Sequence, residues 1–576
     1  MYSYIKTFLA LIILLSAGYA QKNITIDFNN EIGPVKDLMG MCDDFNVEKF
    51  QDYYKEIGLN IVRAHTSCDI FDYYTYTDFF IYDSTEQKYT QRNEDFDPTN
   101  TNNYHWRRVD SLLTIIFNTG LEVLFRFGPA WTPNPDEIEI LLKAPLDPDG
   151  KNFTKFASLC KHTVMHINSD WDNGMNKRIT YWEVWNEPGN KTFWRDTPVN
   201  YYNMYKAVYD SIKKFDPTLK VGAPGAYPVT TLGMQPSYRE EFIKFLRKNN
   251  IGLDFYSWHI YGLKNPYNIK QLAKKIRTIL DTNGFVNTEN IVDEINNNLD
   301  NGLEDFINSA KGAAYYASIL TTAQESDLDK LFWFAGYTFF LTADMKNPKK
   351  IFKWGALALK CFGLITQNTQ IRLKTTGNEV VETELLSIDT TNFVSFASKS
   401  QKADKLYILI SNYNSINKDY NIQITNLPWE KTDSIKIIQN IIKAPKDSFT
   451  QKITYIKGNK DINLSIKNMP APSVLFLRLE KMAKTSVDEN NIINDNTVSI
   501  FPNPVIKNSS FNIKSNMSII KLEIFNITGQ KIKNYKLIHN GKNSYTIKST
   551  NIKSGIYFIK IYFKNKTITK KFTIIK

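Results

Sequence analysis

The feature that most constrains the fold is a regular alternation of short apolar runs and amphipathic segments, from Leu38 to about residue 366. Parallel strands that are covered on both faces read as near-continuous hydrophobic runs, and amphipathic helices place apolar residues at three- and four-residue spacing. The expected strands are 38–42, 60–65, 121–128, 179–187, 220–225, 253–261, 290–296 and 331–337. Eight such repeats predict an α/β fold, a (β/α)8 TIM barrel.

An open doubly wound sheet is the alternative arrangement for the same alternation. Such sheets usually carry a Gly-x-Gly-x-x-Gly loop after the first strand, and no such loop follows here. The helices that we expect between the strands are 47–57, 106–118, 153–167, 201–215, 269–280 and 310–323. We therefore favour the closed barrel.

The remainder of the chain has a different sequence pattern. Beyond residue 366, short alternating segments such as "KLYILISNYN" and "SVLFLRLEK" predict a β-sandwich, and the early "NITIDFNN" is also strand-like. A polar, aperiodic stretch then reads as a linker before a small C-terminal β domain. The expected organisation is 1–20 signal peptide, 21–365 catalytic barrel (with 21–30 able to pair with the sandwich), 366–483 β-sandwich, 484–497 linker and 498–576 C-terminal domain.

The N-terminus and the cysteines bear on where the protein works. Lys6, an apolar segment and a small-residue ending at Ala20 form a secretory signal peptide. No later apolar run reaches the roughly 18–20 residues that span a bilayer, so we expect an exported protein without a transmembrane segment. Cys42 and Cys68 each follow one of two neighbouring expected strands, so a disulfide between them is a hypothesis that export permits.

The positive charge of the chain is confined to its end. Residues 491–576 hold 15 Lys and two acidic residues, whereas the whole chain carries a net charge of +12. The preceding part is therefore close to neutral. This distribution favours solvated Lys on exposed strands over a nucleic-acid site, and we predict no nucleic-acid partner.

Polar side chains end four of the expected barrel strands. Because active sites of such barrels lie at the carboxyl ends of the strands, these residues are expected to meet on one rim. They are Arg63, His65, Asn186, Glu187, His259, Tyr261, Asp293 and Glu294. His162 and His166 lie one helical turn apart, but no Glu follows His162 as a metallohydrolase motif requires, so we predict no metal and no cofactor.

Two carboxylates on one rim, Glu187 and Glu294, indicate glycosidic bond hydrolysis, in which one carboxylic acid protonates the leaving oxygen and the other carboxylate acts at the anomeric carbon. The aromatic neighbours of Glu187 favour its protonated form, so it is the expected acid. Glu183, two residues deeper on the same strand face, is interpreted as structural, with Arg63 or Arg126 as its partner. Whether Asp293 or Glu294 faces inward stays open, because consecutive strand residues face opposite ways.

The runs "IVRAH", "YWEVWNEPGN", "VGAPG", "LDFYSWHIYG" and "IVDEIN" together resemble glycoside hydrolase family 39, the group of β-xylosidases and α-L-iduronidases, over residues 31–365. The resemblance implies a retaining enzyme with Glu187 as acid/base and Glu294 as nucleophile. It also implies that Asn186, His65, His259 and Tyr261 bind the sugar. Two departures are Ile295, where relatives have an aromatic residue, and the eighth strand, "FWFAGYTFF". The predicted substrate-binding set is His65, Asn186, His259, Tyr261, Trp194, Trp333 and Arg63.

The last domain resembles the C-terminal sorting domain of the type IX secretion system, through "VSIFPNPV", "LEIFNITGQKI" and the final strand pair. This resemblance implies export across an outer membrane by that machinery, to a secreted or cell-surface location. The resulting hypothesis is a secreted retaining glycosidase, β-xylosidase-like, acting on plant or algal glycan fragments as its oligo- or polysaccharide substrate. The alternative is a non-catalytic carbohydrate-binding protein on a glycosidase barrel, motivated by the altered residues around Glu294.

Overall fold

The computed structural model divides into two compact units, residues 1–482 and 483–576. It describes residues 22–42, 47–65, 69–130, 137–226, 236–336, 341–342, 351–380, 392–444, 449–482 and 498–575, the last apart from 508, 534, 542, 549–551 and 565–566. The expected signal peptide and Cys68 lie outside the described residues, so the cleavage after Ala20 and the disulfide with Cys42 stay predictions. Among the described helices, none is long and apolar enough to cross a membrane.

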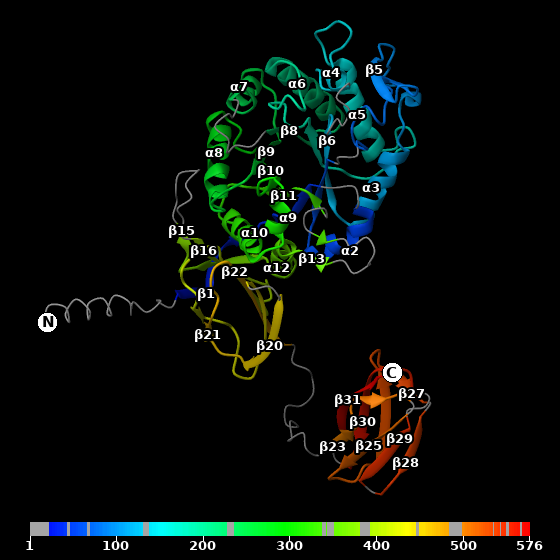
Figure 1. Cartoon of the computed structure of the whole chain (residues 1–576), viewed down its shortest axis with the longest axis vertical. Helices are drawn as coiled ribbons and strands as arrows, with labels where there is room; N and C mark the ends of the chain where they lie inside the picture. The colour runs from blue at the N-terminus through cyan, green and yellow to red at the C-terminus, as the bar shows by residue number, and fades with distance from the viewer. Residues whose placement is uncertain are drawn as a thin grey trace, which may run out of the picture. The chain divides into compact units, whose positions relative to one another are not determined.

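The first unit contains a closed barrel of eight parallel strands surrounded by helices (Figure 1). The strands are, in chain order, β2 (Gly40–Cys42), β3 (Ile61–Ala64), β6 (Glu122–Phe127), β7 (Tyr181–Val184), β8 (Lys220–Ala226), β9 (Phe255–Tyr261), β10 (Glu289–Asn296) and β11 (Lys330–Trp333). Each strand pairs with the next along the chain, and β11 closes on β2. The prediction of a (β/α)8 barrel is confirmed.

The helices outside the barrel pack an apolar face on the strands. They include α2 (Val47–Ile57), α3 (Arg107–Thr119), α5 (Thr154–Asn168), α6 (Pro198–Phe215), α7 (Glu240–Lys248), α8 (Asn268–Thr282), α10 (Ala310–Ala323) and α12 (Trp354–Asn368). Inside the barrel, a layer of apolar side chains fills the amino-terminal half: Ile61, Leu124, Tyr181, Phe255, Ile291 and Phe332. Because this layer closes one end, the polar residues of the same strands are left at the carboxyl end.

A ten-stranded sheet follows the barrel in the same unit. Its strands are β1 (Lys22–Pro34), β14 (Ile371–Thr375), β15 (Glu379–Val380), β16 (Asn392–Lys399), β17 (Lys405–Asn412), β18 (Tyr420–Thr425), β19 (Ser434–Lys443), β20 (Thr450–Lys457), β21 (Ile462–Ile466) and β22 (Ser473–Lys481). The early strand β1 joins it between β14 and β18. Residues of β1, β17, β18 and β22 share one core, so the sheet folds over itself as a sandwich.

The sandwich also packs against the barrel helices. Tyr407, Leu409 and Phe476 belong to the same core as the barrel, whereas their strand neighbours face the interior of the sandwich. Ser411 on β17 accepts a hydrogen bond from Ser318 on α10 at 2.9 Å and donates one to the carbonyl of Ala314 at 2.8 Å. Barrel and sandwich are therefore one continuously packed body.

The second unit consists of two small sheets. One is β23 (Val498–Phe501), β25 (Ser510–Ser515), β29 (Ser544–Lys548) and β28 (Lys536–His539), and the other is β24 (Val505–Ile506), β31 (Thr567–Ile575), β30 (Gly555–Tyr562), β26 (Lys521–Asn526) and β27 (Lys531–Ile532). Alternate residues of these strands face one core that contains Phe511, Ile559 and Phe572. This is the small C-terminal β domain that the sequence predicts.

Candidate active site

The chain leaves strand β7 in a way that turns two polar residues toward the rim. Trp185 and Glu187 have positive backbone φ angles of 76° and 43°, which non-glycine residues rarely adopt. The Glu187 amide donates to the carbonyl of Gly225 on β8 at 3.0 Å, which fixes the turn. As a result Asn186 and Glu187 both point into the barrel mouth.

Trp185 does not share the inward face with Tyr181 and Glu183, so the prediction of regular alternation as far as Glu187 is wrong. Its backbone conformation places the indole outside the barrel, where it lies edge-on to Trp194 with ring centroids 5.1 Å apart. The strand ends at Val184 for this reason. Glu187 reaches the site through the turn, not through strand periodicity.

A β-bulge in β10 settles the question of whether Asp293 or Glu294 faces inward. The pairing of β10 with both β9 and β11 shifts register between Val292 and the residues that follow. A bulge sets two residues opposite one, so Asp293 and Glu294 both face inward. The two residues are nearly completely buried, at 0% and 5% exposed.

Arg63 on β3 is the centre of the cluster. Its guanidinium donates to Glu183 at 2.8 Å, to Glu294 at 2.7 Å and to Asn186 at 2.8 Å, and it lies 3.1 Å from Asp293. The side chain has no exposed surface. A buried cation with this many acidic partners compensates charges that would otherwise be costly to bury.

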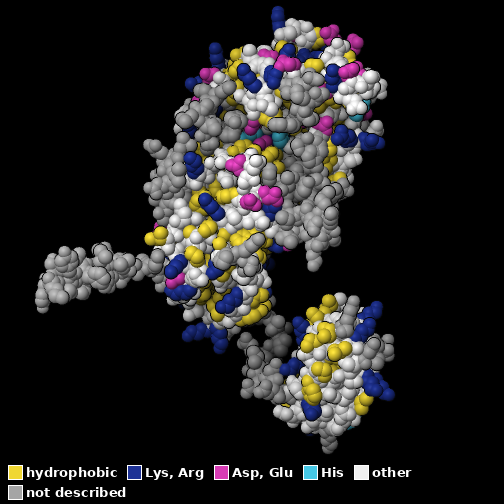
Figure 2. Space-filling view, in the orientation of Figure 1, with side chains coloured by type: hydrophobic (Ala, Val, Ile, Leu, Met, Phe, Trp, Pro, Cys, Tyr) yellow, Lys and Arg dark blue, Asp and Glu magenta, His cyan; other side chains and the backbone are white. Residues whose placement is uncertain are grey.

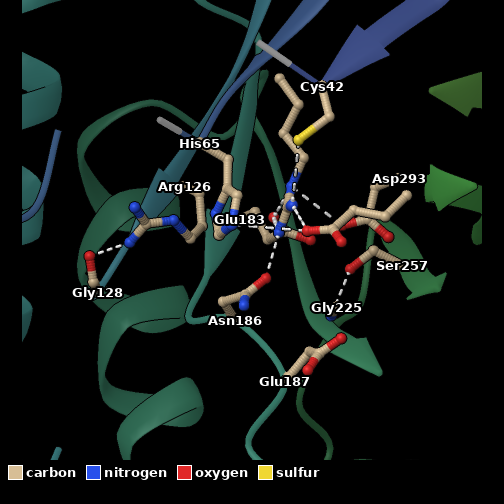
Figure 3. A network of polar contacts seen from close by, with 12 residues as sticks. Cys42, His65, Arg126, Gly128, Glu183, Asn186, Glu187, Gly225, Ser257 and Asp293 are labelled. Carbon is tan, nitrogen blue, oxygen red and sulfur yellow. Dashed lines mark hydrogen bonds and ion pairs between the residues drawn. The ribbon is translucent and has the colours of Figure 1, made fainter. Parts of the chain in front are cut away.

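Of the two partners suggested for Glu183, the structure selects Arg63. Arg126 instead pairs with Asp72 at 2.5 Å and donates to the carbonyl of Gly128. Figure 3 shows Arg126 turned toward Gly128, while Asn186 and Asp293 lie around Glu183. Burial raises the pKa of Glu183 most strongly, and the Asp293 carboxylate adds to this against the opposing Arg63.

The two carboxylates on the rim face each other. One oxygen of Glu187, one of Glu294 and a ring nitrogen of His259 all lie within 4.8 Å of one another. Their other partners differ, because Asn190 donates to Glu187 at 3.0 Å while Arg63 and the Tyr261 hydroxyl donate to Glu294. Glu294 is therefore held by two donors, one from β3 and one from β9.

The two histidines of the cluster have opposite charge preferences. Burial, with Arg63 and Arg126 nearby, holds the pKa of His65 well below its usual range. Burial opposes charge on His259 as well, but Glu294 and Asp293 outweigh it and raise its pKa well above the usual range. The two pKa values are therefore shifted in opposite directions, although both rings are buried.

Acidic and histidine side chains show in a recess on the barrel face in Figure 2. Comparisons with known proteins identify the family of the chain. Residues 13–328 match the model for "Glycosyl hydrolases family 39", which is more than half of the chain. The chain belongs to glycosyl hydrolase family 39.

Relatives and solved structures are consistent with this membership. The chain is 25% identical over 278 residues to a β-xylosidase from Geobacillus stearothermophilus, a match that covers 45% of this chain and 51% of the relative. The chain therefore spans about half the length of that relative. A glucosidase structure from Croceicoccus marinus shares the fold at a TM-score of 0.63 and 19% identity. A family 39 enzyme structure from Xanthomonas axonopodis pv. citri shares it at a TM-score of 0.58 and 16% identity. Each match covers 81% of this chain and 100% of the other chain.

The C-terminal unit gives a separate match. Residues 499–576 match the model for "Secretion system C-terminal sorting domain". This agrees with the resemblance to the type IX sorting domain and with the boundary between the two compact units. The Lys-rich end of the chain therefore belongs to a sorting domain.

The structure brings together seven of the predicted substrate-binding and catalytic side chains and leaves two tryptophans outside. Trp333 is fully buried and lies edge-on to Tyr316 of α10, with ring centroids 4.9 Å apart. Trp194 is 2% exposed, and its indole donates to the carbonyl of Thr197 at 3.3 Å. The cluster comprises Arg63, Asn186, Glu187, His259, Tyr261 and Glu294, with His65 3.6 Å from Glu294.

Three features of the family 39 site were not anticipated. Asn190 binds Glu187 from the turn after β7, and the bulge turns both Asp293 and Glu294 inward, where only one of the two was expected to face inward. Phe334 lies edge-on to Tyr261 at 6.0 Å, one residue beyond the expected Trp333. A polar residue three positions after Glu187 was the available signal for Asn190, but no sequence signal marks the bulge. Ile295, which departs from the family pattern, packs in the barrel core.

Proposed function

We propose that the protein is an exported retaining glycoside hydrolase, β-xylosidase-like, that acts on plant or algal glycan fragments. The observation that carries the proposal is the spacing of Glu187 and Glu294, whose nearest oxygens lie within 4.8 Å. Retaining enzymes hold their two carboxyl groups about 5–5.5 Å apart, whereas inverting enzymes leave about 6.5–9.5 Å for a water molecule. The spacing supports double displacement.

The different partners of the two carboxylates support their division of labour. Glu294, held by Arg63 and Tyr261, attacks the anomeric carbon as a carboxylate and forms a glycosyl ester. Glu187, held by Asn190 and His259, gives its proton to the leaving oxygen as that bond breaks. In the second half-reaction Glu187 takes a proton from water, the water attacks the anomeric carbon, and Glu294 is released.

The preference for xylosides is supported by the β-xylosidase from Geobacillus stearothermophilus, the relative at 25% identity. The C-terminal sorting domain supports passage through the type IX secretion machinery, with the glycan as the other partner. After passage, the protein is secreted or attached to the cell surface.

Hydrolysis of aryl β-D-xylosides by the full chain tests the proposal. We expect turnover by the native protein, with other aryl glycosides, including an α-L-iduronide, as comparison substrates. Glu187→Gln should lower kcat/KM, which reports the first half-reaction, about 10²- to 10⁴-fold for a poor leaving group, because proton donation is lost, and much less for 2,4-dinitrophenol, which departs without a proton. An equal loss for both leaving groups would contradict the role of Glu187. Glycan binding without any turnover would favour the carbohydrate-binding alternative.

A further inference from the structure

His259 lies between the two proposed catalytic carboxylates and a third, inner one. Its Nδ1 is 2.6 Å from Glu187 and 3.5 Å from Glu294, and its Nε2 is 3.4 Å from Asp293. The ring has no exposed surface. Its contact with the sugar stays a prediction, and its ring lies among these three carboxylates.

Both nitrogens of this ring therefore face a carboxylate. A neutral imidazole carries a proton on one nitrogen only and would present a lone pair to one carboxylate, whereas an imidazolium donates from both. On the neighbouring strand β8, a Cβ at Gly225 would lie 3.4 Å from Nε2, so this strand packs against the ring. The charged groups around the ring are Arg63 on β3, Glu183 on β7, Glu187 after β7, and Asp293 and Glu294 on β10, with His65 after β3 as a further titratable group.

The proposed reaction moves one negative charge across this ring. Before the sugar is bound covalently, Glu294 is ionised and Glu187 carries the proton. In the glycosyl ester Glu294 is neutral and Glu187 is ionised, and the second half-reaction reverses the change. Because Nδ1 faces both carboxylates, a fixed positive charge on the ring is close to whichever of the two is ionised.

We propose that Asp293 is a positioning residue that keeps His259 protonated on both nitrogens, so that one imidazolium stabilises Glu187 and Glu294 in turn. The proposal rests on the retaining mechanism proposed above. Burial opposes the ionised form of Asp293, but Arg63 and His259 together hold its pKa below the usual range. Asp293 thus places a third carboxyl group on the Nε2 side of the ring, whereas the charge of the proposed reaction moves on the Nδ1 side.

The protonation of His259 can be measured without reference to activity. In the full chain labelled with ¹⁵N- and ¹³C-histidine, the His259 ring signals, assigned by their loss in His259→Gln, should report an imidazolium from pH 6 through pH 8. Neutral His259 at pH 7 in the native protein would overturn the proposal. If the protein hydrolyses aryl β-D-xylosides but His259 is neutral, only this inference is refuted. If His259 is charged but the protein shows no turnover, only the proposed function is refuted.

Asp293→Asn tests the part played by the inner carboxylate. Loss of a neighbouring anion should lower the pKa of His259 by about one unit or more. The His259 ring signals should titrate at lower pH by a similar amount, and the glycosyl-enzyme step should slow. Asp72→Asn is the matched control, because Asp72 is equally buried and pairs with Arg126, yet it is not among the groups around the ring. An equal titration of His259 in Asp293→Asn and in the native protein would contradict the proposal.

Discussion

Replacing Glu294 with alanine is expected to lower kcat for an aryl β-D-xyloside by about 10⁴- to 10⁶-fold, because the attacking carboxylate is removed. Removal of the side chain leaves space beside Arg63 and Tyr261, the two groups that donate to Glu294. A small anion such as azide should enter this space and attack the anomeric carbon from the same face. The rescued product should therefore be the α-glycosyl azide.

Glu325→Ala is the matched control for this experiment. Glu325 is exposed and lies 3.5 Å from Lys270, at the end of α10 and away from the barrel mouth. Its replacement should leave kcat within a factor of two. If Glu294→Ala kept a tenth or more of native activity, Glu294 would not be the nucleophile.

Arg63→Met is expected to destabilise the protein by about 3–5 kcal/mol, the cost of leaving buried charges without their partner. Arg63 compensates Glu183, Asp293 and Glu294 at once, and none of the three is more than 5% exposed. The first transition in urea-induced unfolding measures this change in the free energy of unfolding. Arg178→Met is the control, because Arg178 is exposed and its ion pair with Asp216 should contribute less than about 1 kcal/mol.

The destabilisation by Arg63→Met should depend on pH in a defined direction. The pKa of Asp293 is lowered in the folded protein, so its ionisation contributes stability above its unfolded value of about 3.9, and this contribution is lost as pH falls through the folded value. Without Arg63 the buried anion is poorly compensated. The difference between variant and native protein should therefore be largest at neutral pH and shrink below pH 4. A difference that grew as pH fell would contradict the role of Arg63.

The barrel could be predicted because its physical signal is local. Parallel strands buried on both faces produce apolar runs, and the helices between them show their own period, so the eight strands appear in the sequence in their correct order. The position of the polar cluster followed from the rule that such strands place their carboxyl ends on one rim. Glu187, Glu294 and Arg63 were found in this way.

The details of the site depend on irregular backbone, which sequence periodicity does not reveal. Positive φ angles at Trp185 and Glu187 end the alternation of β7, and the bulge in β10 turns Asp293 inward together with Glu294. Which arginine pairs with Glu183 depends on contacts between β3 and β7, strands that are not neighbours in the barrel. Trp333 was expected at the site because it ends a strand, but it faces α10 instead.

The central claim is that Glu187 and Glu294 act by double displacement, and the anomeric configuration of the first product tests it most directly. Proton NMR during the cleavage of an aryl β-D-xyloside by the full chain distinguishes the two outcomes before mutarotation mixes them. The proposed mechanism predicts that β-xylose appears first and that the α anomer grows only later. Initial release of α-xylose would show inversion and would contradict the claim.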